Sequence, residues 1–337
     1  MFELQSDKNM SFIPAAERLL LMVQSLTYED PYTFLTLDDY KALYDAGIST
    51  AYFCNTHWAL AEPELNVYDW SLVDREVEKL RKAGMRVMIN CYTDAPRNFR
   101  EDWYVRIQAG FIAGAISMWN EEALEHTEKF YRLMKDRYKA DDLLVVNSWL
   151  TDGETIYLLE PAWYDDAALY DYQTHYGSTA VPAFGDAQTE AWLKESYIKL
   201  MMRWANILVD NPWRELWTML HPAFTTNMYS GGRWIEDVLQ AYSTLTDNIN
   251  HIYYTWVQWS NLYPTMQTWR DKYHTIDWGG AEYAEGLVYT TPLAISNGLR
   301  GQIINPCHPF TKYDRVYPWM VENIKDALLK WNDAVLQ

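Results

Sequence analysis

Short apolar segments alternate with longer segments of helical periodicity along most of the chain. The apolar segments are rich in β-branched and aromatic residues and have the length of buried strands. The longer segments are amphipathic: Leu72, Val73, Val77 and Leu80, for example, recur at helical spacing, and Gly84 ends that pattern. An alternation of buried strands with covering helices predicts a parallel sheet joined by crossover helices.

Eight apolar segments are predicted to be strands, and in chain order they lie near residues 18, 49, 86, 142, 215, 251, 274 and 301. Amphipathic helices are predicted at residues 119–142 and 320–337. Eight strands with intervening helices predict the α/β class and a (β/α)8 TIM barrel, with residues 1–337 as a single domain. A doubly wound open sheet is the alternative, but it needs a glycine-rich turn after the first strand, and none is found there.

The amino-acid composition and the net charge indicate which kind of ligand the protein binds. The chain has 17 Trp and 26 Tyr against 10 Phe, so most of its aromatic rings carry a polar group and suit a wet cleft that stacks on sugar rings. A formal net charge of −18 disfavours nucleic acid and anionic membrane surfaces as partners. A neutral or cationic carbohydrate is therefore the expected partner, and oligomeric state is not predicted.

Metal and redox chemistry are not predicted. Cys54, Cys91 and Cys307 lack metal-ligand spacing and are interpreted as buried thiols, and no histidine pattern typical of a metallohydrolase occurs. No cofactor is expected. The first residues are partly acidic and their apolar run is interrupted by charges, unlike a secretory signal or a membrane anchor, so a cytoplasmic location is expected.

Polar and aromatic side chains follow the predicted strands, where barrel enzymes carry their binding and catalytic groups. The residues predicted to contact a ligand are His57, Trp58, Asn90, Asp94, Trp149, Asp152, His221, Trp256, Gln258, Trp278, Tyr283, Glu285 and His308. Each histidine has the alternative of a structural role. Each tryptophan has the alternative of packing inside the barrel.

Four segments together resemble known enzymes. Trp58, Glu62-Pro63, Tyr68-Asp69-Trp70 and Asp74 are similar to an element before the second helix of family 42 glycoside hydrolases, the β-galactosidases, and residues 84–99 are similar to their third strand. Residues 164–178 resemble a helical insertion of the same enzymes. Residues 152–161 resemble, more distantly, the family 14 β-amylases. One departure is that Gly153 precedes Glu154, where the family 42 pattern has Asn.

This resemblance implies a glycoside hydrolase, whose reaction needs a proton donor and a second carboxylate. Glu154, after the fourth predicted strand, is the expected acid/base, and Asp152 is expected to influence its pKa; the alternative is a solvated loop glutamate. Glu282, after the seventh strand, is the expected second carboxylate. Glu285 takes that place if the strand runs three residues further. A carbohydrate-binding barrel without activity is the alternative function.

Overall fold

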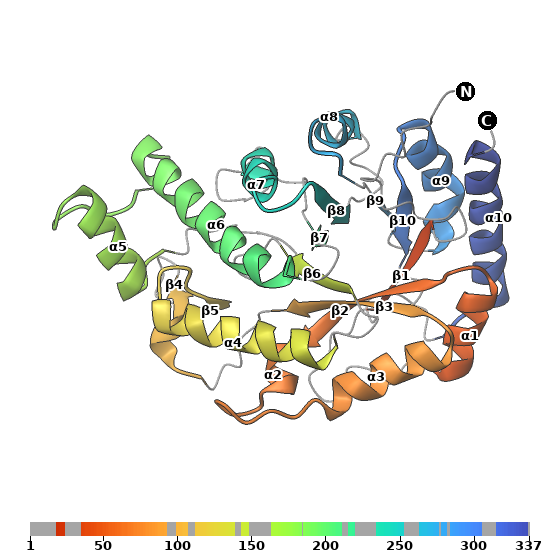
Figure 1. Cartoon of the computed structure of the whole chain (residues 1–337), viewed down its shortest axis with the longest axis horizontal. Helices are drawn as coiled ribbons and strands as arrows, with labels where there is room; N and C mark the ends of the chain where they lie inside the picture. The colour runs from red at the N-terminus through yellow and green to blue at the C-terminus, as the bar shows by residue number, and fades with distance from the viewer. Residues whose placement is uncertain are drawn as a thin grey trace, which may run out of the picture.

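The structure of the chain is a computed structural model (Figure 1). It describes residues 18–23, 35–92, 99–106, 112–138, 143–147, 163–183, 185–210, 215–219, 234–252, 263–275, 278–281, 284–304 and 315–335.

Eight strands form one sheet in which every described pair is parallel. They are β1 (Leu19–Val23), β2 (Thr50–His57), β3 (Arg86–Tyr92), β6 (Leu143–Asn147), β7 (Glu215–Met219), β8 (Asn248–Ile252), β9 (Trp278–Ala281) and β10 (Gly301–Ile304). All eight predicted strands are therefore confirmed. Two predicted positions are shifted by a few residues: β8 begins earlier than expected and β9 later.

The strand order is β8-β7-β6-β3-β2-β1-β10-β9. Strands that are adjacent in the sheet are also consecutive along the chain when only these eight strands are considered. The exception is the pair β1 and β10, which are the first and the last of the eight. The two end strands, β8 and β9, are consecutive in that order, and their Cα atoms approach within 8 Å of each other. The α/β class with an all-parallel, eight-stranded sheet is confirmed.

The helices lie around the strands (Figure 1). They are α1 (Leu37–Asp45), α2 (Trp58–Ala61), α3 (Ser71–Lys82), α4 (Glu121–Arg137), α5 (Asp166–Tyr176), α6 (Ala187–Leu208), α7 (Ile235–Tyr242), α8 (Tyr263–Tyr273), α9 (Leu287–Ser296) and α10 (Pro318–Val335). Figure 1 also shows α5 and the start of α6 projecting away from the sheet. No helix in the described ranges is long and apolar enough to cross a membrane.

The predicted amphipathic helices follow the expected pattern of burial. In α3 the apolar positions Val73, Val77 and Leu80 are buried, and Gly84 adopts a positive φ of 94° just after the helix, a backbone conformation that glycine tolerates best. In α4, Asn120 caps the first turn by accepting a hydrogen bond from the Ala123 N–H. Both predicted helices, and the one at the C-terminus, are confirmed.

The segment between β3 and α4 was not predicted to contain strands. Between β3 and α4 the chain forms a small antiparallel pair, β4 (Tyr104–Arg106) and β5 (Ile112–Ile116), preceded by a 3-10 turn over Glu101–Trp103. We call this pair the β4–β5 hairpin. It lies between α4 and α5 (Figure 1), so an insertion after the third strand of the sheet meets the segment that follows the fourth.

Candidate active site

The carboxyl ends of the parallel strands bring several predicted site residues to one edge of the sheet. His57 is the last residue of β2 and is paired in register with Tyr92, the last residue of β3. Asn90 of β3 is paired with Val145 of β6. Residues separated by many positions in the sequence therefore lie on neighbouring strands at this edge. Trp278 instead begins β9, at the opposite end of that strand.

The strand boundary at β9 bears on the choice between Glu282 and Glu285. The described strand ends at Ala281, the residue before Glu282 in the sequence. Glu285 lies in a 3-10 turn over Ala284–Gly286, and its side chain is exposed. The choice between Glu282 and Glu285 as the second carboxylate stays a prediction.

Most of the predicted ligand contacts lie outside the described residues: Asp94, Trp149, Asp152, Glu154, His221, Trp256, Gln258, Glu282, Tyr283 and His308. For His57, Asn90 and Trp278 the backbone is described and the side chain is not. Within the described ranges, no group of three or more His, Cys, Asp or Glu is arranged to hold a metal ion.

Trp58 packs inside the protein. Its side chain is fully buried, and its ring stacks on Phe130 at 5.2 Å and on His126 at 5.8 Å between centroids. Phe99 meets it edge-on at 5.7 Å. Because other side chains cover its ring, Trp58 has the packing role that was the alternative in the sequence analysis. It is not exposed to stack on a sugar.

A hydrogen bond to Glu62 fixes the Trp58 ring in this buried position. Its carboxylate is fully buried and accepts hydrogen bonds from Trp58 Nε1 at 2.5 Å and from the Asn66 N–H at 2.6 Å, and its Oε1 lies 2.8 Å from His126 Nε2. Burial and the neighbouring Glu62 carboxylate together raise the pKa of Tyr68 well above its ordinary value. A buried carboxylate with this many partners ties α2, the turn after it and α4 together.

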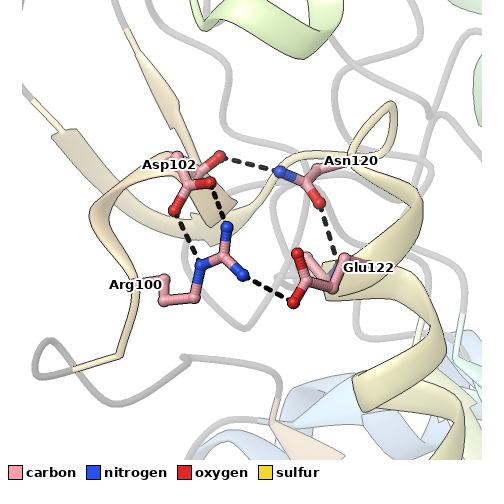
Figure 2. A network of polar contacts seen from close by, with 5 residues as sticks. Arg100, Asp102, Asn120 and Glu122 are labelled. Atoms are coloured by element: carbon pink, nitrogen blue, oxygen red, sulfur yellow. Dashed lines mark hydrogen bonds and ion pairs between the residues drawn. The ribbon is translucent and has the colours of Figure 1, made fainter.

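A network of polar contacts attaches the β4–β5 hairpin to the start of α4 (Figure 2). The Arg100 guanidinium donates to Asp102 at 2.7 and 3.1 Å and to Glu122 at 2.5 Å. The Asn120 side-chain amide donates to the Asp102 carbonyl at 2.9 Å while its oxygen caps α4. The turn that precedes β4 is thus fixed relative to the start of this helix.

Comparison with known proteins identifies the family of this chain. The sequence profile of the glycoside hydrolase 42 family, described as beta-galactosidase, matches residues 34–218, more than half of the 337 residues. The chain belongs to this family. It is a glycoside hydrolase, as the motifs before α3 and around α5 predicted.

Solved structures agree on the fold. The catalytic domain of β-amylase from Paenibacillus polymyxa is similar with a TM-score of 0.71 at 10% identity, covering 92% of this chain and 97% of that one. A β-galactosidase from the psychrophilic Marinomonas ef1 has a TM-score of 0.66 at 11% identity, covering 93% of this chain and 59% of that one. A β-galactosidase from the Antarctic haloarchaeon Halorubrum lacusprofundi gives 0.65 at 11%, covering 94% and 58%.

This glycoside hydrolase thus spans about three fifths of the length of the two galactosidases and nearly all of the amylase domain. A comparison with curated proteins found no match. The predicted resemblance to family 42 is confirmed, and the similarity to the β-amylase is one of fold.

Two features near the candidate site were not predicted. The partnership of Glu62 with His126 joins α2 to a distant helix, and sequence spacing carries no signal for it. Asp165 hydrogen-bonds Ser117 across the β4–β5 hairpin. The sequence does indicate the capping role of Asp165, because an aspartate shortly before a helical Ala-Ala-Leu segment is typical of a helix N-cap.

Proposed function

We propose that this glycoside hydrolase cleaves a neutral or cationic oligo- or polysaccharide with Glu154 as acid/base and Glu282 as the second carboxylate. Glycosidic cleavage passes through an oxocarbenium-like transition state, which needs a proton for the leaving oxygen and an anion, or an activated water, at the opposite face of the sugar. Two carboxylates at one strand edge supply both functions.

The observation that carries this proposal is the place of β6 and β9 in the sheet. They are the fourth and seventh of eight parallel strands, so their carboxyl ends lie at the same edge. Glu154 follows β6, and Glu282 directly follows β9. The family profile also extends across residue 154.

We further propose that the sheet closes between β8 and β9 into a (β/α)8 barrel that forms one catalytic domain. The strand order and the approach of the two end strands within 8 Å support closure. In such a barrel the strand-end side chains predicted above, Trp58 and Trp278 excepted, would line the mouth. Because the family is described as beta-galactosidase, β-galactosides are the first substrates to test.

The test compares Glu154→Gln and Glu282→Gln with the parent enzyme on an aryl β-galactoside and a disaccharide. Each is expected to lose about 100-fold or more in kcat on the disaccharide, since one general acid/base contributes about 10²–10⁴-fold. Glu78→Gln is the control, because it removes one carboxylate from the exposed face of α3. Normal turnover by either active-site variant would contradict the assignment of that residue.

Glu285→Gln distinguishes the two possible second carboxylates. We expect it to retain far more activity than Glu282→Gln, since its side chain lies on an exposed turn beyond the strand end. The reverse result would assign the role to Glu285. If added sugar instead raised the melting temperature while no aryl glycoside in a broad panel released its chromophore, the protein would be a carbohydrate-binding barrel.

A further inference from the structure

Arg18 is a buried arginine at the amino-terminal edge of the sheet. It directly precedes β1 and is 4% exposed. Its carbonyl accepts a hydrogen bond from the N–H of Gln302 in β10 at 2.7 Å, so the starts of these two neighbouring strands are joined there. The proposed catalytic carboxylates follow the carboxyl ends of their strands. Arg18 therefore lies at the opposite edge of the sheet from them.

The Arg18 guanidinium has few acceptors. Within the described residues it donates one hydrogen bond, from Nη1 to the carbonyl of Arg300 at 2.5 Å. Its Nε is buried and has no hydrogen-bond partner. Nε and Nη2 form the edge of the planar group with which an arginine can bind two oxygens of a carboxylate or a phosphate side by side. In Arg18 no described residue accepts a hydrogen bond from this edge.

Arginines elsewhere in the described chain differ from Arg18 in this respect. Carboxylates pair with Arg100, Arg106, Arg137 and Arg203. The side chains of these four are between 19% and 45% exposed, whereas Arg18 is the one buried arginine of the described residues. The cation that is furthest removed from water is thus a cation without a carboxylate partner in the described structure.

The surroundings of Arg18 disfavour its positive charge. Burial and, as a second cause, the charge of the half-buried Arg300 lower the pKa of Arg18 below its ordinary value. An arginine nevertheless stays protonated in a protein. Because a buried charge is costly unless it is paired and hydrogen-bonded, a negative partner at this position would stabilise the folded chain.

We propose that Arg18 and Arg300 form a binding site for one small oxyanion, a phosphate or a carboxylate, at the amino-terminal edge of the sheet. The Nε–Nη2 edge of Arg18 binds two oxygens of the anion, and Arg300 adds a second positive charge beside it. Chloride has no pair of oxygens to match this edge. A chain with a formal net charge of −18 repels anions in general, so tight binding of an oxyanion requires a local site of this kind.

Binding is measured by equilibrium dialysis of the full chain against radiolabelled phosphate in a chloride buffer. We expect about one phosphate per chain at saturation, and Arg18→Met is expected to weaken binding about tenfold or more, because it removes charge-assisted hydrogen bonds. Arg18→Lys keeps the charge but not the planar edge, so it is expected to remain weaker than the parent. Arg106→Gln is the matched control: it removes an exposed arginine that already pairs with Glu101, and it should bind phosphate as the parent does.

Thermal unfolding gives a second readout. Phosphate is expected to raise the melting temperature of the parent and of Arg106→Gln by about 2 °C or more over chloride of equal ionic strength, and that of Arg18→Met by less than half as much. In chloride alone, Arg18→Met should be at least as stable as the parent, because it removes a buried charge that has no partner. Acetate in place of phosphate distinguishes the two sources of oxygen, and protection by either supports the oxyanion site.

The proposal is overturned if neither phosphate nor acetate protects the parent more than chloride does, a result that would show the Arg18 charge to be tolerated without an anion. It is also overturned if Arg18→Met retains the full protection. If Arg18→Met does not fold, the number of phosphates bound by the parent and the weaker binding expected of Arg18→Lys decide the matter.

Discussion

The Glu62 carboxylate shows how one residue can hold several elements together. Charged groups are buried only when they are paired and hydrogen-bonded, and Glu62 meets that condition through Trp58, Asn66 and His126. Trp58 and Asn66 are close to Glu62 in the sequence, whereas His126 comes from α4. Removing the carboxylate would leave three buried or half-buried polar groups without their acceptor.

Glu62→Ala is therefore expected to lower the free energy of unfolding by about 3 kcal/mol or more, the cost of breaking a buried pair. Urea unfolding followed by tryptophan fluorescence measures it. Glu64→Ala is the matched control, because Glu64 lies two residues away on the surface, where a change within about 0.5 kcal/mol is expected. Equal effects of the two substitutions would show that the buried network contributes little.

Single residues were predicted unevenly from the sequence. Trp58 and Glu62 stood out as a motif, yet the contact of Glu62 with His126 was not foreseen, because His126 comes from a distant helix. Glu282 was preferred over Glu285 on position, and that preference stays a prediction. Contacts that join remote segments have no periodic pattern, so sequence spacing does not reveal them.

The packing of α1 against α3 includes a second buried carboxylate. Glu76 accepts a hydrogen bond from Tyr40 and forms an ion pair with Lys79 at 2.7 Å, and Lys79 also donates to the Leu35 carbonyl at 2.9 Å. Burial raises the pKa of Glu76 above its ordinary value of 4.5, although Lys79 and Tyr40 act in the opposite direction. The folded protein therefore binds this proton more tightly than the unfolded chain does.

The contribution of Glu76 to stability is consequently greatest below pH 4.5 and is lost as the pH rises through its raised pKa. The free energy of unfolding of the parent minus that of Glu76→Gln should fall as the pH is raised from about 4 to 7. Denaturant titrations at several pH values measure this difference. Glu78→Gln, on the exposed face of the same helix, measures the effect of charge loss alone. A difference that rises with pH would contradict the assignment.

Elements with strong periodicity, or with a clear position between helices, were predictable, and the β4–β5 hairpin was not. The eight strands of the sheet have a run of apolar residues or a clear position between helices, and α3, α4 and α10 have amphipathic patterns. The β4–β5 hairpin has a first strand of three residues and a second with the sequence Ile-Ala-Gly-Ala-Ile, whose small residues have low strand propensity. Its stability comes from tertiary contacts, such as those of Arg100 and Ser117.

At the scale of the whole molecule, the order of the strands determines where chemistry can occur. An all-parallel sheet places every strand's carboxyl end at one edge, so residues from the beginning and the end of the chain meet there. The sequence allowed this edge and its candidate residues to be predicted. It did not allow the mutual distances of their side chains to be predicted, because these depend on how the loops after β6 and β9 pack.

The most direct test of the account is the distance between the carboxyl groups of Glu154 and Glu282 in a crystal structure of the enzyme with a bound product sugar. We predict that both carboxyls contact the sugar and lie either about 5–5.5 Å apart, as in retaining glycosidases, or about 6.5–9.5 Å apart, as in inverting ones. Carboxyls that point away from the sugar, or lie much further apart than either range, would contradict a shared catalytic role.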